Sequence, residues 1–223
     1  MKQQSRISSW LADHELELIQ TADYIFQHPE LAYKEELSSK YLSNYLEQQG
    51  FHISKETAGI STAFTAEWGL GKPVLGFLAE YDALAELGHA CGHNLLGTGV
   101  AAAACALKAD MEATGASGTI RVYGCPAEEI MSGKIVMMKQ GVFQNLDVAV
   151  TWHPFDRNRI SNDIWQSQDI KNYTFHGVSA HASRNPENGR SALDAAELMN
   201  IGVNYLREHV PTDVRMHLSL IHI

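Results

Sequence analysis

Apolar positions in the N-terminal part of the chain repeat at the spacing of amphipathic helices. Between residues 5 and 28 they recur every three or four positions, which places them near one face of a helix. A second helical pattern runs from Glu35 to Gln49, and Gly50 follows it as a helix-ending glycine. His28-Pro29 separates the two patterns, because the residue before a proline disfavours helical geometry. The chain therefore opens with two predicted helices.

Short apolar runs that alternate with helical stretches follow. The continuous run from Val74 to Ala79 is typical of a strand buried on both faces, and Val148 to Thr151 is predicted to be another buried strand. This alternation predicts an α/β fold with a mixed, largely parallel sheet flanked by helices. The predicted strands cover residues 51–54, 62–68, 74–79, 118–123 and 148–151, and the predicted helices cover residues 94–109 and 133–139.

The pattern changes again near residues 162–167. Asp169 to His176 alternates like a strand, and Gly189 to His209 has the period of a long amphipathic helix. We expect residues 1–165 to form a catalytic metal-binding domain and residues 166–223 to begin an α+β lid or dimerisation domain. One strand and one helix cannot bury both faces of such a domain, so we expect a truncated chain that is inactive alone. Its closing residues resemble translated adapter sequence.

Composition and charge exclude several classes of partner. Hydrophobic residues make up 45% of the 223 residues, enough for a sizeable core. The 17 Lys and Arg against 26 Asp and Glu give a net charge of -9, which disfavours nucleic acid and anionic membrane surfaces. We find no secretory signal and no apolar run of membrane-spanning length. Three cysteines without a signal peptide predict free thiols and a cytoplasmic protein.

Polar clusters follow three of the predicted strands. The first cluster, residues 88–94, contains Cys91 and His93; the second, residues 125–129, ends in two adjacent glutamates; the third contains His153. Ligands of open α/β sheets gather outside the carboxyl ends of the strands, so these clusters are expected to meet. Thiolate, imidazole and carboxylate are zinc ligands. Of the glutamates Glu128 and Glu129, one can bind a metal while the other moves protons.

Other interpretations of these residues differ in how much of the pattern they explain. A single loop histidine or cysteine is most often structural, and adjacent glutamates commonly begin a helix. A thiol hydrolase would use Cys91 as nucleophile with His93 or His153 as base, but it leaves the glutamates without a role. A zinc nucleobase deaminase needs a Pro-Cys-x-x-Cys element, which this sequence lacks.

Six stretches together resemble a known family. They resemble metallopeptidase family 20, the aminoacylase, carboxypeptidase and amidohydrolase group. Within it, they are most similar to the branch that holds one of the subunits of aminobenzoyl-glutamate hydrolase and the β-alanyl-lysine-type dipeptidases. Asn94, where many relatives have aspartate, fits that branch. The resemblance covers roughly residues 10–217, and its stretches are residues 76–84, 88–97, 123–129, 152–154, 180–182 and 189–195.

The resemblance implies a role for each matching residue. Cys91, His93, Glu129 and His153 match metal ligands, and Glu128 matches the general base that activates water. Asp82 sits where the family often has an aspartate near the metals. His181 matches a lid histidine that reaches an active site, often that of the partner subunit, and steadies the developing oxyanion.

The function that follows is hydrolysis of an amide bond in an N-acyl amino acid or dipeptide-like substrate by metal-activated water. The expected cofactor is one or two divalent ions, zinc or manganese, and the expected assembly is a homodimer formed through the lid. The alternative is a non-catalytic remnant that keeps metal binding and the dimerising surface.

Overall fold

The computed structural model describes residues 2–130, 132–160 and 166–219 of the chain. Two compact units are present, residues 1–159 and residues 160–223. The expected boundary near residues 162–167 falls largely outside the described residues, so the division into residues 1–165 and 166–223 stays a prediction. None of the described helices is long and apolar enough to cross a membrane.

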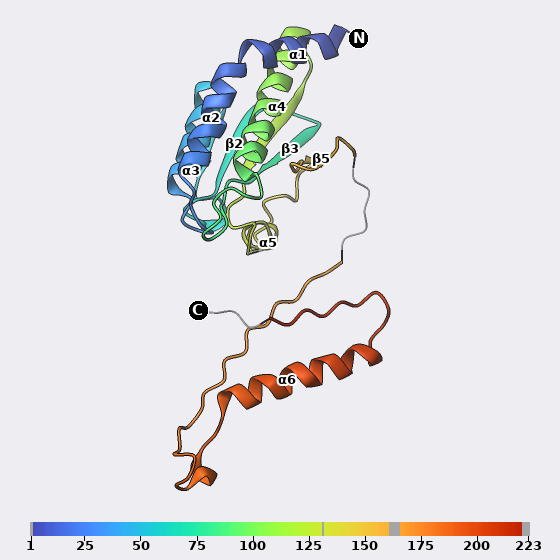
Figure 1. Ribbon diagram of the computed structural model, residues 1–223. Coiled ribbons are helices and arrows are strands. Elements are labelled where there is room, and N and C mark those ends of the chain that lie inside the picture. The colour runs from blue at the N-terminus through green and yellow to red at the C-terminus, as the bar shows by residue number, and fades with distance from the viewer. Residues whose placement is uncertain (1, 131, 161–165, 220–223) are drawn as a thin grey trace. The chain divides into compact units, whose positions relative to one another are not determined.

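Helices cover the sheet of the first unit (Figure 1). The predicted helix over residues 5–28 is wrong in one respect, because it is interrupted at His14. There the backbone leaves helical geometry, with φ -109° and ψ 8°. The His14 ring stacks on Trp10, and its Nδ1 lies 2.8 Å from the Trp10 carbonyl oxygen. The helices of this unit are α1 (Lys2–Asp13), α2 (Glu15–Gln27), α3 (Glu36–Gln48), α4 (His93–Thr114) and α5 (Gly133–Lys139).

The sheet has five strands in the order β1-β2-β4-β3-β5. β1 pairs antiparallel with β2, and β2 pairs antiparallel with β4, whereas β3 pairs parallel with β4 and with β5. β1, β3, β4 and β5 therefore run in one direction and only β2 runs against them, which confirms the predicted mixed, largely parallel sheet. The strands are β1 (His52–Lys55), β2 (Phe64–Leu70), β3 (Val74–Ala79), β4 (Gly118–Gly124) and β5 (Val148–Val150).

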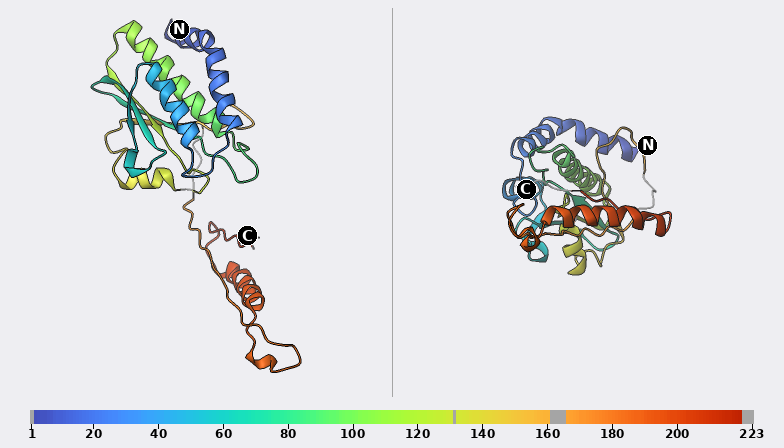
Figure 2. Two further views of the ribbon diagram at one scale, coloured as in Figure 1. Left: turned by 90° about the vertical axis from the view of Figure 1, so that its left-hand side faces the viewer. Right: turned by 60° about the horizontal axis from the view of Figure 1, so that its bottom comes forward.

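Alternation along the central strands fills a core on each face of the sheet. Ile120 and Val122 of β4 belong to the larger core, which includes residues from α2, α3 and α4. Tyr123, one position further on, belongs to a second cluster around Met137 of α5. The two views of Figure 2 show α1 to α4 gathered on one side of the strands. The rigid central strands thus support the loops at their carboxyl ends.

The edge strand β5 differs from its prediction. Val148 is 48% exposed and Val150 is 43% exposed, so the prediction of a strand buried on both faces is wrong. A strand that is buried on both faces lies in the middle of a sheet. β5 is the last strand in the order and pairs with β3 on one side, so it is an edge strand. Its apolar residues reflect strand propensity rather than a place in the core.

The second unit is built around α6 (Ala192–Leu206), which a short 3₁₀ turn extends through His209. Ser191 caps α6, because its side chain accepts a hydrogen bond from the Asp194 amide. The strand predicted over Asp169 to His176 is wrong, because these residues have no regular secondary structure. Alternating polarity alone does not make a strand without a neighbour to receive its backbone hydrogen bonds.

Candidate metal centre

Three parallel strands deliver acidic, thiol and imidazole side chains to one edge of the sheet. Glu80 and Asp82 follow β3, Glu128 follows β4, and His153 follows β5. His93 is the first residue of α4. Because β3, β4 and β5 run in the same direction, their carboxyl ends meet at this edge.

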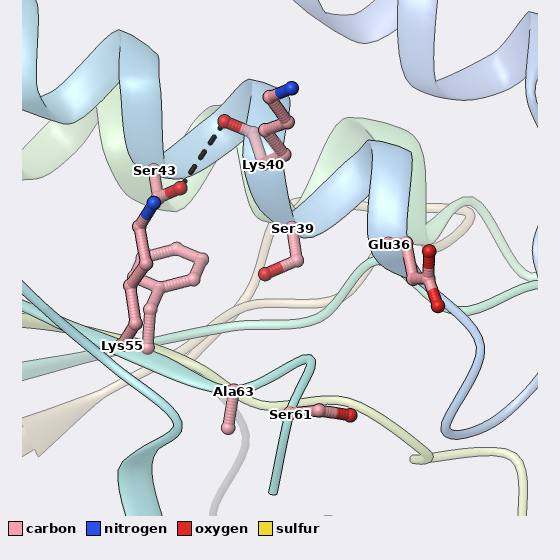
Figure 3. A pocket seen from close by; sticks show the side chains of 8 residues that line it. Glu36, Ser39, Lys40, Ser43, Lys55, Ser61 and Ala63 are labelled. Atoms are coloured by element: carbon pink, nitrogen blue, oxygen red, sulfur yellow. Dashed lines mark hydrogen bonds between the residues drawn. The ribbon is translucent and has the colours of Figure 1, made fainter.

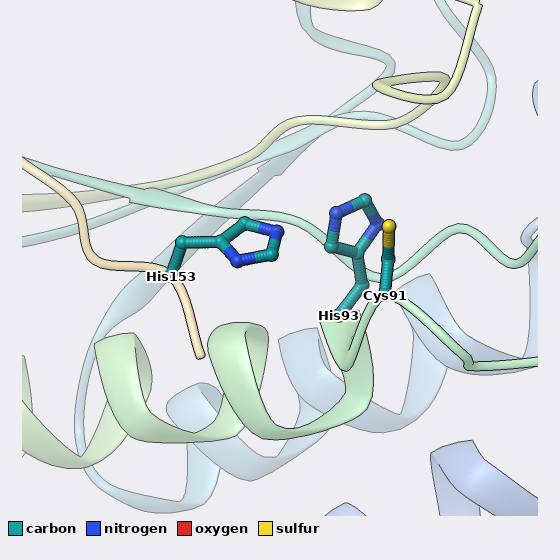
Figure 4. Close-up of side chains that lie close together, drawn as sticks. All are labelled: Cys91, His93 and His153. Carbon is teal, nitrogen blue, oxygen red and sulfur yellow. The ribbon is translucent and has the colours of Figure 1, made fainter. Parts of the chain in front are cut away.

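Cys91, His93 and His153 converge, as Figure 4 shows. One candidate ligand atom from each lies within 4.8 Å of the others. The two imidazole rings meet edge to face, with centroids 5.7 Å apart. Gly92 permits this approach, because it adopts φ +80° and a Cβ there would lie 2.9 Å from Cγ of Pro154. The structure therefore brings together three of the four residues predicted as ligands.

The ring of His93 is buried and held by Asp82. Nδ1 lies 3.1 Å from the Asp82 carbonyl oxygen and 3.0 Å from Asp82 Oδ1. A carbonyl oxygen only accepts, so Nδ1 carries the hydrogen. Nε2 then has its lone pair free, and it lies 3.3 Å from Glu80 Oε2 with no hydrogen-bond partner. This tautomer is the one in which a histidine binds a metal through Nε2.

The paired glutamates lie on either side of the His93 ring. Glu128 Oε2 lies 3.9 Å from Nε2, and Glu129 Oε1 lies 3.8 Å from Nδ1. Glu128 forms a second candidate ligand group with Glu80 and His93. Among the described residues, Glu129 belongs to neither group, although the sequence predicted it as a ligand. Its backbone amide donates to Asp82 Oδ2 over 2.9 Å.

Negative charge dominates the electrostatics of the site. Burial opposes protonation of His93, but the hydrogen bond to Asp82 and the charges of Asp82, Glu80 and Glu129 outweigh it, so the pKa of His93 is raised. A hydrogen bond with Glu129, burial and the surrounding carboxylates raise the pKa of the Cys91 thiol to about 11. A field that retains protons in this way also attracts a cation.

These residues fit a divalent metal ion. Nε2 of His93 and Oε1 of Glu129 are buried polar atoms without a hydrogen-bond partner, a costly state that a bound cation relieves. Thiolate, imidazole and carboxylate are also the donor types that zinc takes. The types of donor atom and the unpartnered buried atoms therefore both fit a bound divalent metal ion.

Glu80 is a site residue that sequence reasoning missed. Its carboxylate is buried, with Oε1 paired to Lys134 Nζ and Oε2 facing His93. Its position directly after β3 was the available signal, since that position points it at the same edge as Asp82. A glutamate beside a metal ligand either joins the ligands or tunes their charge.

Asn94 makes a structural contact near the start of α4. Asn94 is buried and donates through Nδ2 to the Ala22 carbonyl over 3.3 Å, a bond that an ionised aspartate could not make. His181 belongs to the second unit, where its Nδ1 accepts a hydrogen bond from the Ser183 amide and lies 3.1 Å from Ser183 Oγ. The active-site role of His181 stays a prediction.

A cavity of about 170 Å³ lies elsewhere, between α3 and the segments around β1 and the start of β2 (Figure 3). Serine and lysine side chains make up most of its lining, and none of the predicted site residues contributes. It lacks the convergent acid, thiol and imidazole groups that carry chemistry at the sheet edge.

An α/β domain with thiol, imidazole and carboxylate groups at the carboxyl edge of its sheet has the architecture of a metallopeptidase catalytic domain. The chain belongs to peptidase family M20/M25/M40, whose profile matches residues 77–208. This match confirms the family that the sequence motifs indicated.

Two curated relatives illustrate the similarity. The chain is 43% identical over 216 residues to one of the subunits of p-aminobenzoyl-glutamate hydrolase of Escherichia coli, covering 89% of this chain and 45% of the relative. It is 37% identical over 205 residues to Xaa-Arg dipeptidase of Mus musculus, covering 86% of this chain and 47% of the relative. The chain thus spans about half the length of the curated relatives it matches.

Solved structures confirm the fold. An aminobenzoyl-glutamate utilization protein from Klebsiella pneumoniae has a TM-score of 0.64 at 20% identity, over 90% of this chain and 60% of that chain. A dinuclear metal-binding peptidase of the M20 family from Bacillus subtilis has a TM-score of 0.54 at 24% identity, over 62% of this chain and 42% of that chain.

Proposed function

We propose that the chain carries the metal centre of an amidohydrolase or dipeptidase that hydrolyses an amide bond in an N-acyl amino acid or dipeptide-like substrate. The convergence of Cys91, His93 and His153 beside two glutamates is the observation that carries this proposal. Membership of the peptidase family supports it. A bound dication would supply a polarised carbonyl and a water of lowered pKa.

Glu128 is assigned as the general base and Glu129 as a ligand together with Cys91, His93 and His153. Distance alone would make Glu128 a metal ligand together with His93. The burial of the two glutamate side chains favours the opposite assignment, with Glu129 as the ligand. The Glu129 side chain is 15% exposed, and its Oε1 is buried without a partner, so it gains more from a cation. Glu128 is 33% exposed, which leaves it access to water and to a leaving nitrogen.

Asp82 supports this centre without binding the metal. It fixes the His93 tautomer through one carboxylate oxygen and the Glu129 backbone through the other. Carboxylates in this position orient metal-binding histidines and raise their basicity.

Zinc is the proposed ion, because the soft Cys91 thiolate favours zinc over manganese. A cytoplasmic location fits the three cysteines, all of which are free thiols. For the second unit we propose dimerisation, because α6 exposes Leu193, Leu198 and Ile201. His181 in that unit is assigned to oxyanion stabilisation on the resemblance alone.

The test is metal-dependent turnover. This chain and the product of the full reading frame that encodes it are each stripped with a chelator, reloaded with zinc, and offered p-aminobenzoyl-glutamate, Xaa-Arg dipeptides and N-acyl amino acids. Product release that follows the metal supports the proposal. Stoichiometric metal binding without turnover by either protein on any substrate supports the non-catalytic alternative, and failure of both to bind metal contradicts both proposals.

A further inference from the structure

The loop between α2 and α3 contacts both acidic loops of the metal centre. The Glu30 carbonyl oxygen accepts a hydrogen bond from the Ala83 amide over 2.8 Å, next to Asp82. Glu35 Oε1 accepts a hydrogen bond from the Ala127 amide over 2.8 Å, next to Glu128. One short segment therefore holds the residues that follow β3 and those that follow β4.

Ala127 has an unusual conformation for a residue with a side chain. Its φ is +58°, in the left-handed region that glycine adopts readily, asparagine sometimes, and other residues rarely. Its carbonyl oxygen accepts from the Ser132 amide over 3.1 Å, and its amide donates to Glu35. Bonds on both sides of Ala127 hold the turn in a shape that the chain would otherwise leave. That shape sets the direction in which Glu128 and Glu129 leave β4.

Glu35 is an acidic residue whose burial carries a free-energy cost. Its side chain is fully buried, and Oε1 accepts from both the Tyr33 and the Ala127 amides, at 3.0 and 2.8 Å. Oε2 has no hydrogen-bond partner. A buried carboxylate without a cation is unfavourable, and burial raises the pKa of Glu35 accordingly. What the carboxylate provides is a fixed acceptor for the Ala127 amide.

We propose that Glu35 is a positioning residue for the metal centre: by holding the Ala127 amide, it fixes the turn that aims Glu128 and Glu129 at His93. The Tyr33 hydroxyl, which is hydrogen-bonded to Ser132 Oγ, supports the far end of the same turn. This inference rests on the proposed function, since it assumes that the glutamates act at a metal.

Cobalt(II) binding to the 223-residue chain tests this role. Glu35→Met and Glu35→Gln form a matched pair of similar size, and only glutamine keeps an oxygen acceptor. The methionine variant is expected to bind cobalt about 10–100-fold more weakly, with an altered visible absorption spectrum. Its Ala127 amide is expected to exchange hydrogen faster. The glutamine variant is expected to retain the spectrum and the slow exchange.

Asp110→Ala serves as the control, because Asp110 is also a buried carboxylate with an unpartnered oxygen, but it pairs with Arg6. It is expected to lower stability without changing the cobalt spectrum. Unchanged cobalt affinity and spectrum in folded Glu35→Met, or a disturbed spectrum in Glu35→Gln, overturns the inference. If Glu35→Met does not fold, Tyr33→Phe, which lacks the hydroxyl that is hydrogen-bonded to Ser132, replaces it. Weaker cobalt binding by Tyr33→Phe then supports the positioning role, and unchanged binding overturns it. A wild-type chain that binds no cobalt overturns the proposed function, and this inference with it.

Discussion

Asp82 fixes the imidazole of His93 through a 3.0 Å contact between its Oδ1 atom and Nδ1 of the ring. The second oxygen of the same carboxylate accepts the Glu129 amide over 2.9 Å. Both oxygens therefore accept N–H groups, so one buried side chain holds both the His93 ring and the Glu129 backbone. An isosteric amide cannot replace this carboxylate, because one of its two polar atoms is a donor.

Asp82→Asn is therefore expected to weaken zinc binding about 10–100-fold, since either His93 or Glu129 then faces a donor. A competition titration with a chromogenic chelator measures the change. Asp13→Asn, at an exposed position near the end of α1, is the control and should leave affinity unchanged. Wild-type affinity in Asp82→Asn would show that the carboxylate does not organise the centre.

In the product of the full reading frame, Glu128→Gln is expected to reduce hydrolysis by about 10²–10⁴-fold while leaving zinc content nearly intact, because an amide cannot accept the proton. Glu129→Gln is expected to lose zinc and activity together, because the buried Oε1 atom is the assigned ligand. Metal analysis beside initial rates separates the two effects. Loss of zinc from Glu128→Gln with retention in Glu129→Gln would reverse the assignment.

Sequence patterns predicted the sheet and the helices of the first unit because each element has its own periodicity. β3 and α5 have the predicted bounds, residues 74–79 and 133–139. The patterns predicted less about each element's surroundings. The run at Val148 looked like a buried strand, but exposure depends on strand order, which local sequence does not encode. The strand predicted at Asp169 was wrong because a strand needs a partner as well as alternation.

The candidate site was predictable where residue type and strand ends coincided. Cys91, His93 and His153 meet as expected, because strand direction sends all three to one edge. Glu80 was missed, since a single glutamate after a strand does not differ in sequence from a solvated one. Glu35 was also missed, because its contact with Ala127 joins residues 92 positions apart.

Gly92→Ala is expected to weaken zinc binding as well as the fold. Alanine at φ +80° is strained by about 1–2 kcal/mol, and its Cβ would push on Pro154, which follows His153. Gly71→Ala is a matched control, because it has φ +88° but no heavy atom within 4 Å of the added Cβ. Denaturant melts should show the backbone strain in both variants and a further loss of stability in Gly92→Ala from the contact with Pro154. Equal zinc affinity in the two variants would contradict the idea that the close packing of Gly92 against Pro154 shapes the metal centre.

In the product of the full reading frame, Cys91→Ser is expected to weaken zinc binding and activity together, because serine is a poor ligand for a soft dication. Excess zinc should restore part of the activity. Mass spectrometry of wild-type protein after substrate addition examines the rival mechanism. An acyl-thioester trapped on Cys91 would establish the thiol hydrolase, in which Cys91 is the nucleophile.

The last prediction concerns pH and the free energy of unfolding of the metal-free chain. Burial raises the pKa of Glu35 above its ordinary value of 4.5. As pH rises above that value, the unfolded chain loses this proton before the folded chain does, so the group's contribution to stability falls until the raised pKa is passed. Glu35→Gln has no such proton and should be more stable than wild type at neutral pH by about 1–3 kcal/mol. The difference should shrink as pH falls toward 4.5. Urea melts of both proteins in chelator measure it, and a difference that is constant or grows on acidification would show that Glu35 is not a buried, destabilised carboxylate.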